Sequence, residues 1–274
     1  SPERVDPGRA TPAPHQIPKV VSGIDAESLA RVRAVYGAVY ETIVPVSSME
    51  AAETVKLYEN CFRVVNIAYI NEIADLCENV GVDVSEVVRA ASTKPFGFMP
   101  FFPGMGMGGH CLPVNPHYLR QAGELPVLEQ ATALMDARPA KKAAEIAGAL
   151  PAGAKVLFMG VGYKQGESLV GAFSPGHRCC KELARLGVRV SVYDPCVAAG
   201  ASAAGAELGF EFVPPEQLRA NVSGVDMVVV NMALQPWEAA AVAALEGAGG
   251  CVRHSNRTPA VNPVTIGAEA GACK

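Results

Sequence analysis

The spacing of apolar residues changes along the chain and divides it into parts of different structure. From Ala51 to Asn79 there is neither proline nor glycine, and apolar residues cover most of the helical circumference. This pattern predicts a long and largely buried helix. After residue 150, short apolar runs at 155–160, 188–195 and 225–230 alternate with helical spacing at 175–186 and 236–245. Such alternation predicts a parallel sheet covered by helices.

Shorter elements are expected before and between these parts. Residues 1–48 have the pattern of the end of a domain, because short strands and turns dominate them. Helix-capping residues, and the glycines and prolines that end helices, then set the expected bounds of the helices. The predicted elements are a strand at 19–23, a helix at about 25–40, a strand at 42–46, a helix at about 83–92 and helical spacing over 119–150, interrupted near 124–126 and at Pro139.

Residues 93–118 form the most unusual stretch of the chain. They hold too many glycines and prolines for a helix or a central strand, and they are too apolar for an ordinary solvated loop. A loop of this kind is typical of a wall around a ligand, because glycine lets the backbone approach closely. Gly104, Gly106 and Gly109 fit G-x-G-x-x-G, but no strand precedes them and Leu112-Pro113 follows, so we reject a dinucleotide phosphate turn here.

Composition narrows the classes of function. The chain has 274 residues, half of them hydrophobic, and a net charge of −4 without a basic run. We therefore expect neither a nucleic-acid partner nor a membrane partner. The eight cysteines include no C-x-x-C pair, which argues against a metal site, and free thiols are typical of the cytoplasm. The chain begins Ser1-Pro2-Glu3 without methionine, which suggests a processed protein or a fragment.

The run from Pro95 to Pro116, PFGFMPFFPGMGMGGHCLPVNP, resembles the catalytic-cysteine loop of the UDP-glucose/GDP-mannose dehydrogenase family. It is most similar to the UDP-N-acetylhexosamine 6-dehydrogenase branch, whose loop ends Gly-Gly-His-Cys-x-Pro-Val-Asp-Pro. The resemblance covers residues 1–138 with few interruptions and the remainder more weakly. It implies an α/β protein in which an all-helical middle domain precedes a Rossmann-like parallel-sheet C-terminal domain. The expected parts are 1–48 (tail of an NAD-binding domain), 49–138 (helical, dimerising, with the catalytic cysteine) and 139–274 (UDP-sugar-binding).

The resemblance implies a specific chemistry for Cys111. Family members oxidise the C6 alcohol of a nucleotide sugar to a carboxylate, with NAD as hydride acceptor and a cysteine thioester as intermediate. From the residues alone, Cys111 is either a buried structural cysteine or a nucleophile. Its place beside the glycines favours the nucleophile, and cations such as Lys56 would favour its thiolate.

One line of the long helix carries Lys56, Asn60 and Arg63 at i, i+4 and i+7. Taken alone, this line fits a solvated stripe at least as well as a polar site. In the resembled family, the residues that match Lys56 and Asn60 face the reacting sugar carbon, where they hold the oxyanion and orient water. The resemblance also implies further site residues. Glu3 is expected beside the sugar as a catalytic residue, and Phe102, Gly104, Gly108, Arg63 and Lys164 are expected to contact the substrate.

The C-terminal part contains a second apparent nucleotide motif. A strand ends in Gly160-x-Gly162, and Asp194 ends the next strand, where a dinucleotide fold places its ribose carboxylate. The third glycine position holds Gln165, however, and no helix is expected before Pro175. We therefore expect no NAD binding there. The resemblance instead implies that this domain holds the UDP part of the substrate.

Three departures from the family pattern affect the expected activity. The family's Pro-Val-Asp-Pro has Asn115 in place of the aspartate, and an amide cannot accept a proton as a carboxylate does. Ala172 replaces an arginine that contacts NAD in the family. Most of the NAD-binding domain is absent as well. The chain alone should therefore form no NADH, and thioester hydrolysis should be slow.

The sequence thus predicts part of an NAD-dependent nucleotide-sugar 6-dehydrogenase that acts as a cytoplasmic homodimer on UDP-N-acetylhexosamine or UDP-glucose. GDP-mannose is the alternative substrate, although residues 94–98 favour the UDP-sugar branch. A non-catalytic module that binds sugar nucleotides or dimerises is the alternative from another class, and the three departures motivate it. A purely structural α/β protein is the third possibility, and the Gly-His-Cys sequence argues against it.

Overall fold

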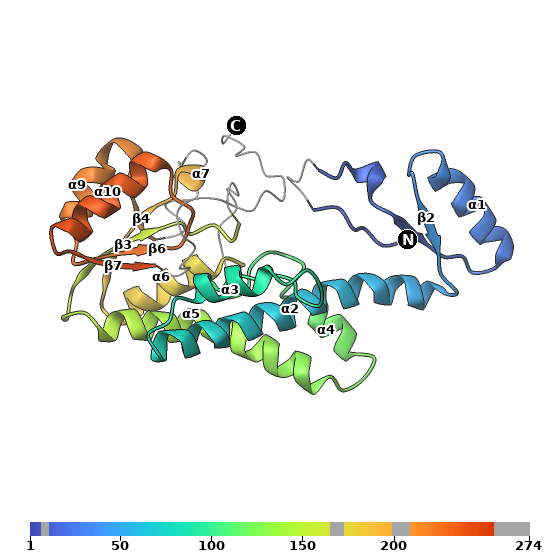
Figure 1. Cartoon of the computed structure of the whole chain (residues 1–274), viewed down its shortest axis with the longest axis horizontal. Coiled ribbons are helices and arrows are strands. Elements are labelled where there is room, and N and C mark those ends of the chain that lie inside the picture. Colours follow the sequence, from blue (N-terminus) through green and yellow to red (C-terminus); the bar gives the residue numbers. More distant parts are fainter. Residues whose placement is uncertain (7–10, 165–172, 199–208, 255–274) are drawn as a thin grey trace.

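The computed structural model describes residues 1–6, 11–164, 173–198 and 209–254. The chain forms a small N-terminal unit, a central group of helices and a C-terminal sheet. Figure 1 shows the N-terminal unit and the sheet at opposite ends of an elongated molecule, with the central helices between them. Within the described residues, no helix combines the length and apolar character needed to cross a bilayer.

The N-terminal unit is a strand–helix–strand arrangement, as the sequence predicts for residues 19–46. A short 3-10 helix, η1 (Pro14–Gln16), precedes β1 (Lys19–Val21), α1 (Ala26–Gly37) and β2 (Ile43–Pro45), and the two strands pair in parallel. The side chain of Asp25 caps α1 by accepting a hydrogen bond from the Ser28 N–H. Helix α1 buries none of its side chains, so one surface of this unit is left uncovered.

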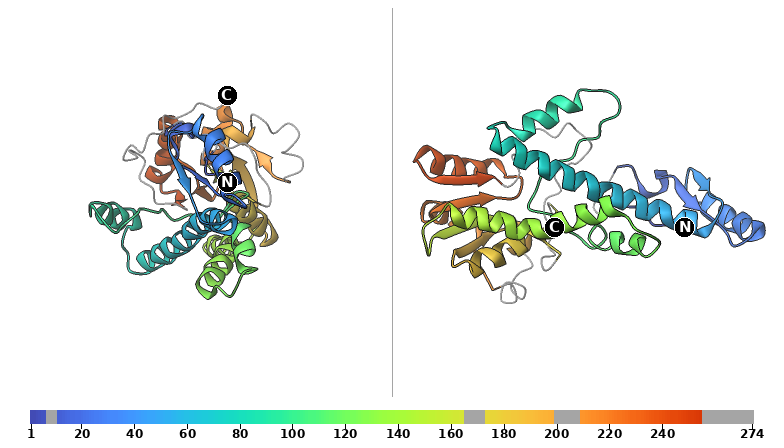
Figure 2. Two further views of the ribbon diagram at one scale, coloured as in Figure 1. Left: turned by 90° about the vertical axis from the view of Figure 1, so that its right-hand side faces the viewer. Right: turned by 90° about the horizontal axis from the view of Figure 1, so that it is seen from below.

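Four helices make up the central part, namely α2 (Met49–Asn79), α3 (Val84–Ser92), α4 (Asn115–Arg120) and α5 (Pro126–Gly148). Helices α2 and α5 pack against each other, as Figure 2 shows in its right-hand view. Their shared core includes Val64 and Ala68 of α2 with Leu128 and Met135 of α5. The long helix predicted for residues 51–79 is therefore confirmed, and so is the helix expected to end near residue 92.

Helix α5 differs from the prediction because it continues through Pro139. A proline inside a helix removes one backbone hydrogen bond and costs about 3 kcal/mol. Burial on both sides of the proline outweighs this cost, since Met135, Ala143 and Ile146 are all at most 2% exposed. The expected interruption at Pro139 is thus wrong. The boundary placed between residues 138 and 139 falls inside one helix, which packs against both α2 and α6 (Pro175–Arg185).

The C-terminal part is a five-stranded parallel sheet with helices, so the predicted α/β fold is confirmed. After β3 (Lys155–Met159) and α6 come β4 (Arg189–Tyr193), α7 (Pro195–Ala198), β5 (Glu211–Phe212), η2 (Pro215–Gln217), α9 (Leu218–Ser223), β6 (Met227–Val230), α10 (Pro236–Gly247) and β7 (Cys251–His254). The strand order is β5-β4-β3-β6-β7. The direction of winding reverses between β3 and β6, which is where ligands bind in open sheets of this kind.

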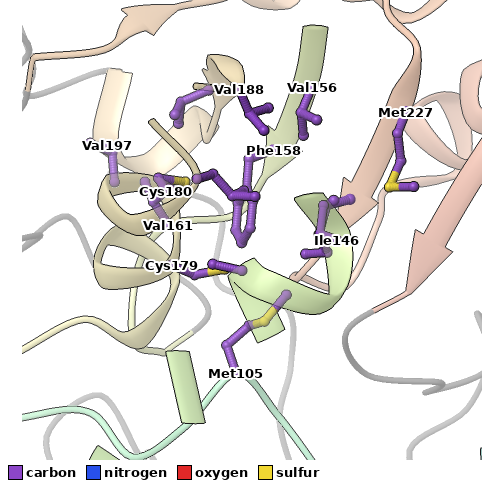
Figure 3. Close-up of a cluster of buried hydrophobic side chains, with 14 residues drawn as sticks. Met105, Ile146, Val156, Phe158, Val161, Cys179, Cys180, Val188, Val197 and Met227 are labelled. Carbon is purple, nitrogen blue, oxygen red and sulfur yellow. The ribbon is translucent and has the colours of Figure 1, made fainter. Parts of the chain in front are cut away.

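Two apolar cores lie on the two faces of this sheet. One contains Leu157, Met159 and Val228 with residues of α9 and α10. The other, drawn in Figure 3, contains Val156 and Phe158 of β3 with Cys179 and Cys180 of α6. Burial raises the pKa of both thiols, so they are inert core residues. Ile146 of α5 and Met105 of the loop between α3 and α4 enter this second core as well.

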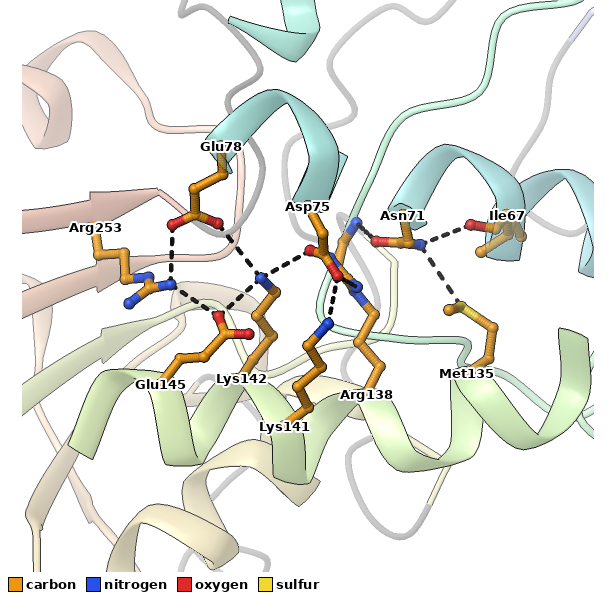
Figure 4. A network of polar contacts seen from close by, with 11 residues as sticks. Ile67, Asn71, Asp75, Glu78, Met135, Arg138, Lys141, Lys142, Glu145 and Arg253 are labelled. Carbon is orange, nitrogen blue, oxygen red and sulfur yellow. Dashed lines mark hydrogen bonds and ion pairs between the residues drawn. The ribbon is translucent and has the colours of Figure 1, made fainter. Parts of the chain in front are cut away.

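An ionic network joins the central helices to the edge of the sheet, as Figure 4 shows. Asp75 of α2 pairs with Arg138, Lys141 and Lys142 of α5, at 2.9, 2.7 and 3.0 Å respectively. The network continues through Glu78 and Glu145 to Arg253 of β7. Three elements that are far apart in the sequence are held together by these contacts.

Candidate active site

Cys111 lies at the end of the glycine-containing loop, immediately before α4. It is an exposed, free thiol. Its carbonyl oxygen accepts hydrogen bonds from the N–H groups of Val114, at 3.2 Å, and Asn115, at 2.9 Å. The chain from Cys111 to Asn115 is therefore a single helical turn, which fixes both residues relative to each other while the sulfur stays accessible.

Asn60 connects α2 to this turn. Its side chain is only 8% exposed, and its Nδ2 donates a hydrogen bond to the Oδ1 of Asn115. The two amides belong to residues 55 positions apart, so the contact brings the helix and the cysteine loop together. The Asn115 oxygen is an acceptor in this pair, and an amide has no basic site for a water proton.

The three residues on one line of α2 differ in exposure. Lys56 is half-buried, Asn60 is buried and Arg63 is exposed. Lys56 interacts electrostatically with the carboxylate of Glu3. The structure thus brings Lys56, Asn60 and Asn115 to the same side of α2 as Glu3 and the cysteine turn. Among the described residues, Arg63 makes no hydrogen bond or ion pair with the other predicted site residues.

Glu3 is held in place by the backbone of the residues that follow it. Its Oε1 accepts hydrogen bonds from the N–H groups of Val5, at 2.8 Å, and Arg4, at 2.7 Å. The hydrogen bond from Val5, with that from Arg4 and the charges of Lys19 and Lys56, lowers the pKa of the Glu3 carboxyl despite some burial. Glu3 is therefore an anion beside Lys56 at neutral pH.

Arg4 and Lys19 fasten this segment to the rest of the molecule. Arg4 pairs with Glu59 of α2 at 2.6 Å and also donates to the Pro18 carbonyl. Lys19, which is 7% exposed, donates to the Pro2 carbonyl and lies 5.2 Å from the ring centres of Tyr36 and Tyr40. Both residues escaped the sequence reasoning, because their partners are recognisable only in the folded molecule.

The loop residues expected to contact substrate differ in exposure and in their protein contacts. Phe102 is 48% exposed. Gly104 donates its N–H to Asn71 and accepts at its carbonyl from Arg138, so both of its backbone groups already bind protein. At Gly108 an added Cβ would lie 2.6 Å from the Cβ of Tyr163, which places this glycine against another domain. Their role in substrate binding stays a prediction.

Asn71 and Arg138 were missed by the sequence reasoning. Asn71 is completely buried and Arg138 is 5% exposed, and together they hold the loop at Gly104. The signal in the sequence was a polar residue among the mostly apolar positions of each helix. A buried polar group needs a partner, so such a residue indicates a specific contact.

Lys164 follows the turn after β3, at the carboxyl edge of the sheet, and pairs with Asp6 at 3.0 Å. The other candidate of this edge, Asp194, accepts backbone hydrogen bonds from Val161, Gly162 and Cys196. Its carboxylate therefore stabilises the turn by these backbone hydrogen bonds. Gln165 and Ala172, on which two of the sequence arguments rest, lie outside the described residues.

In the described part of the chain, no group of three or more His, Cys, Asp or Glu side chains is arranged to hold a metal ion. The groups gathered at the site are an exposed thiol, an ammonium group, a carboxylate and two paired amides.

Comparisons with known proteins fit this arrangement. The profile of the UDP-glucose/GDP-mannose dehydrogenase family, central domain, matches residues 50–137. The UDP-N-acetyl-D-glucosamine 6-dehydrogenase of Pseudomonas aeruginosa is 35% identical over 217 residues, which are 73% of this chain and 49% of that protein. The UDP-N-acetyl-D-mannosamine dehydrogenase of Methanococcus maripaludis is 30% identical over 234 residues, covering 84% of this chain and 52% of that protein. The chain spans about half the length of these relatives.

Solved structures agree with the sequence comparison. The UDP-D-ManNAc dehydrogenase of Pyrococcus horikoshii superposes with a TM-score of 0.74 at 26% identity, over 97% of this chain and 62% of that one. The NDP-N-acetyl-D-galactosaminuronic acid dehydrogenase of Methanosarcina mazei gives 0.70 at 28% identity, over 88% and 55%. In these comparisons the helical middle part and the parallel sheet recur together. The chain belongs to the UDP-glucose/GDP-mannose dehydrogenase family.

Proposed function

We propose that this chain carries the cysteine site and the nucleotide-sugar site of an NAD-dependent UDP-N-acetylhexosamine 6-dehydrogenase. The observation that carries the proposal is the contact between Asn60 of α2 and Asn115, one helical turn after the exposed Cys111. This contact brings the exposed thiol of Cys111, two amides and the nearby Lys56 close together, which supports the role of Cys111 as a nucleophile. The Pseudomonas aeruginosa and Methanococcus maripaludis relatives are named as dehydrogenases of UDP-N-acetyl-D-glucosamine and UDP-N-acetyl-D-mannosamine.

Each residue has a defined role in this proposal. The sulfur of Cys111 forms a bond to the carbonyl carbon of the C6 aldehyde, and the electron pair of the C=O bond moves to the oxygen. The ammonium group of Lys56 stabilises the resulting oxyanion. At the thioester stage, Asn60 orients the attacking water. Glu3 stays anionic and holds the Lys56 side chain near the oxyanion.

Among the described residues of this chain, we find no site that fits NAD. The carboxylate of Asp194 already binds the backbone of its own turn, and β1–α1–β2 is too small a unit for a dinucleotide. We therefore assign the hydride acceptor to a domain outside these 274 residues. The exposed side chains of Ile24, Val35 and Val39, at 82, 68 and 63%, offer an apolar surface on which such a domain would pack.

The UDP part of the substrate is assigned to the carboxyl edge of the C-terminal sheet. Lys164 lies there, after the central strand β3 and next to the point where the winding reverses. Its ammonium group suits a diphosphate, which would replace Asp6 as its anionic partner.

Helix α2 supports the assignment of a homodimer. Four large side chains on it, Tyr58, Phe62, Tyr69 and Leu76, are exposed within one narrow face, and Val80, directly after its end, continues the same line. A continuous apolar stripe of this length is typical of a protein interface. A second copy of α2 is the occupant that we propose. We further assign the protein to the cytoplasm, where thiols stay reduced.

The binding part of the proposal is tested with the 274-residue chain. Isothermal titration with UDP-N-acetylglucosamine should show binding, and the same ligand should slow iodoacetamide labelling of Cys111, followed peptide by peptide. The exposed thiol of Cys251 is the internal control and should label at an unchanged rate. Binding without protection of Cys111 would contradict the proposed site. The same titration and labelling with GDP-mannose decide between UDP-sugars and GDP-sugars as ligands.

The alternative is a non-catalytic sugar-nucleotide-binding module, and the amide at position 115 is the observation that favours it. Under this alternative, binding and protection occur but no oxidation follows, even when an NAD-binding domain of a relative is fused to the chain. Formation of NADH by the fusion protein, and its loss in Cys111→Ser, would exclude the alternative.

A further inference from the structure

The last glycines before Cys111 lie against the C-terminal domain. A Cβ added at Gly108 would lie 2.6 Å from the Tyr163 Cβ, 2.7 Å from the Pro175 ring and 2.9 Å from the Phe173 carbonyl oxygen. No side chain fits into such a space, so glycine is required by this packing. Gly109 has a φ of +89° and donates its N–H to the Phe173 carbonyl at 3.0 Å.

Two further contacts fix the loop to the same domain. The ring of His110 packs on the ring of Phe173, with 4.8 Å between the ring centres. Met105, 4% exposed, lies in the core formed by β3 and α6 (Figure 3). The position of Cys111 therefore depends on the C-terminal domain as well as on α2.

The surface that receives the loop is the turn that precedes Lys164. Asp194 binds the N–H groups of Val161 and Gly162, at 2.9 and 3.1 Å. The hydroxyl of Ser174 donates to the Val161 carbonyl. These bonds join the turn and the start of α6 into one unit. Tyr163, which touches Gly108 and Gly109, is the immediate neighbour of Lys164.

We infer that the segment Gly108–His110 couples nucleotide binding at Lys164 to the position and reactivity of Cys111. The inference rests on the proposed function, because it takes Lys164 to be a nucleotide contact. Tyr163 and His110 are positioning residues in this account. A nucleotide bound at Lys164 holds the turn, and with it the loop, in the docked position, because close-packed groups transmit a displacement instead of absorbing it. Binding of the nucleotide alone, without a sugar near the thiol, should then slow the chemistry of the thiol.

The test uses UDP as the probe and the 274-residue chain. UDP lacks the sugar that would cover Cys111 directly, so any effect on this thiol must travel through the protein. The affinity for UDP is measured by titration calorimetry. The rate of iodoacetamide labelling at Cys111 is measured by peptide mass spectrometry, with and without saturating UDP.

In the unaltered protein, UDP should slow the labelling of Cys111 by about fivefold, at the lower end of ordinary coupling between two sites. Gly108→Ala should label faster without UDP and, at saturating UDP, should lose the response to UDP. Gly123→Ala is the matched control, because a Cβ there meets no atom within 4 Å. Its labelling should respond to UDP as in the unaltered protein.

Exchanges at His110 distinguish positioning from a loss of folding. His110→Phe keeps a ring against Phe173 and should keep the response to UDP, whereas His110→Ala should lose it. If UDP binds but leaves the labelling of Cys111 unchanged in the unaltered protein, the coupling is refuted and the proposed function survives. If UDP does not bind, the nucleotide assignment at Lys164 is wrong, and the coupling fails with it.

Discussion

Position 115 decides how the proposed enzyme completes its reaction. Asn115 uses its amide oxygen to accept a hydrogen bond from Asn60, and it has no group that takes a proton from water. The carboxylate of Glu3 does not replace it, because its Oε1 already binds the N–H groups of Arg4 and Val5. The hydrolysis of a thioester on Cys111 should therefore limit turnover.

Asn115→Asp tests this account of the residue. An aspartate has the same shape, keeps the acceptor for Asn60 and adds a base, and a positioned general base contributes about 10²-fold or more. In the enzyme completed by an NAD-binding domain, steady-state NADH formation should rise by about that factor. Asn66→Asp, at a position of α2 where the side-chain amide donates to the Phe62 carbonyl, is the control. An unchanged rate in Asn115→Asp would show that hydrolysis is not limiting.

At the scale of elements, Met105 ties the cysteine loop to the core between β3, α5 and α6. Truncation to alanine removes buried apolar atoms and leaves a cavity, so Met105→Ala should lower the free energy of unfolding by about 2–4 kcal/mol. Met99→Ala, whose side chain is 60% exposed, should change it by less than about 0.5 kcal/mol. Urea denaturation measures both. Equal stability of the two variants would mean that the loop is not anchored through Met105.

The ionic network between α2 and α5 is a second interaction that holds elements together. Burial alone would raise the pKa of the Asp75 carboxyl, but hydrogen bonds from Arg138, Lys141 and Lys142 outweigh it and hold this pKa well below its ordinary value. A carboxyl with a lowered pKa in the folded state stabilises the protein above its unfolded-state pKa, 3.8, and this contribution is lost as the pH falls towards the folded-state pKa.

Asp75→Asn should therefore destabilise the protein at pH 7, by about 3 kcal/mol, because Arg138 keeps a buried charge without its partner. The difference from the unaltered protein should shrink as the pH falls below 3.8. Glu78→Gln is the matched control, since the Glu78 side chain is 59% exposed and its ion pairs contribute about 1 kcal/mol or less. Urea denaturation as a function of pH gives both results. A difference that is independent of pH would assign the effect to packing.

The elements themselves follow from local sequence to different extents. The spacing of apolar residues predicts α2, β3, β4 and β6, because each buries a regular face or a continuous run. It does not predict β5, which has two residues, or the continuity of α5 through Pro139. The glycines of the cysteine loop show most clearly what local sequence does not predict. Their pattern indicates close approach, but only the fold reveals that Gly108 approaches Tyr163, 55 positions away.

At the scale of the whole molecule, the described chain leaves apolar surfaces uncovered, and two of them bear on the proposed assembly. One is the N-terminal surface around Val35 and Val39, and the other is the stripe along α2. In the proposed enzyme, the NAD-binding domain would cover the first surface and a second copy of the chain would cover the second. The site lies between the two surfaces, where residues of the N-terminal segment, α2, the cysteine loop and the sheet meet.

Tyr69→Glu tests the dimer interface on α2. The Tyr69 side chain is 61% exposed in the single chain and lies in the middle of the stripe. A buried charge in an interface between two identical helices meets its own copy, so this exchange should convert the dimer to a monomer in sedimentation experiments. Glu53→Lys, on the opposite side of α2, should remain a dimer. A dimer that survives Tyr69→Glu would place the interface elsewhere.

The central claim is that Cys111 is the nucleophile for a UDP-sugar aldehyde. The most direct measurement is peptide mass spectrometry of the chain fused to an NAD-binding domain, quenched in acid after exposure to UDP-N-acetylglucosamine and NAD. The account predicts an acyl adduct, with the mass of the oxidised sugar nucleotide, on the peptide that contains Cys111, and its absence in Cys111→Ser. NADH formation without any adduct on Cys111, or with full activity in Cys111→Ser, would contradict the claim.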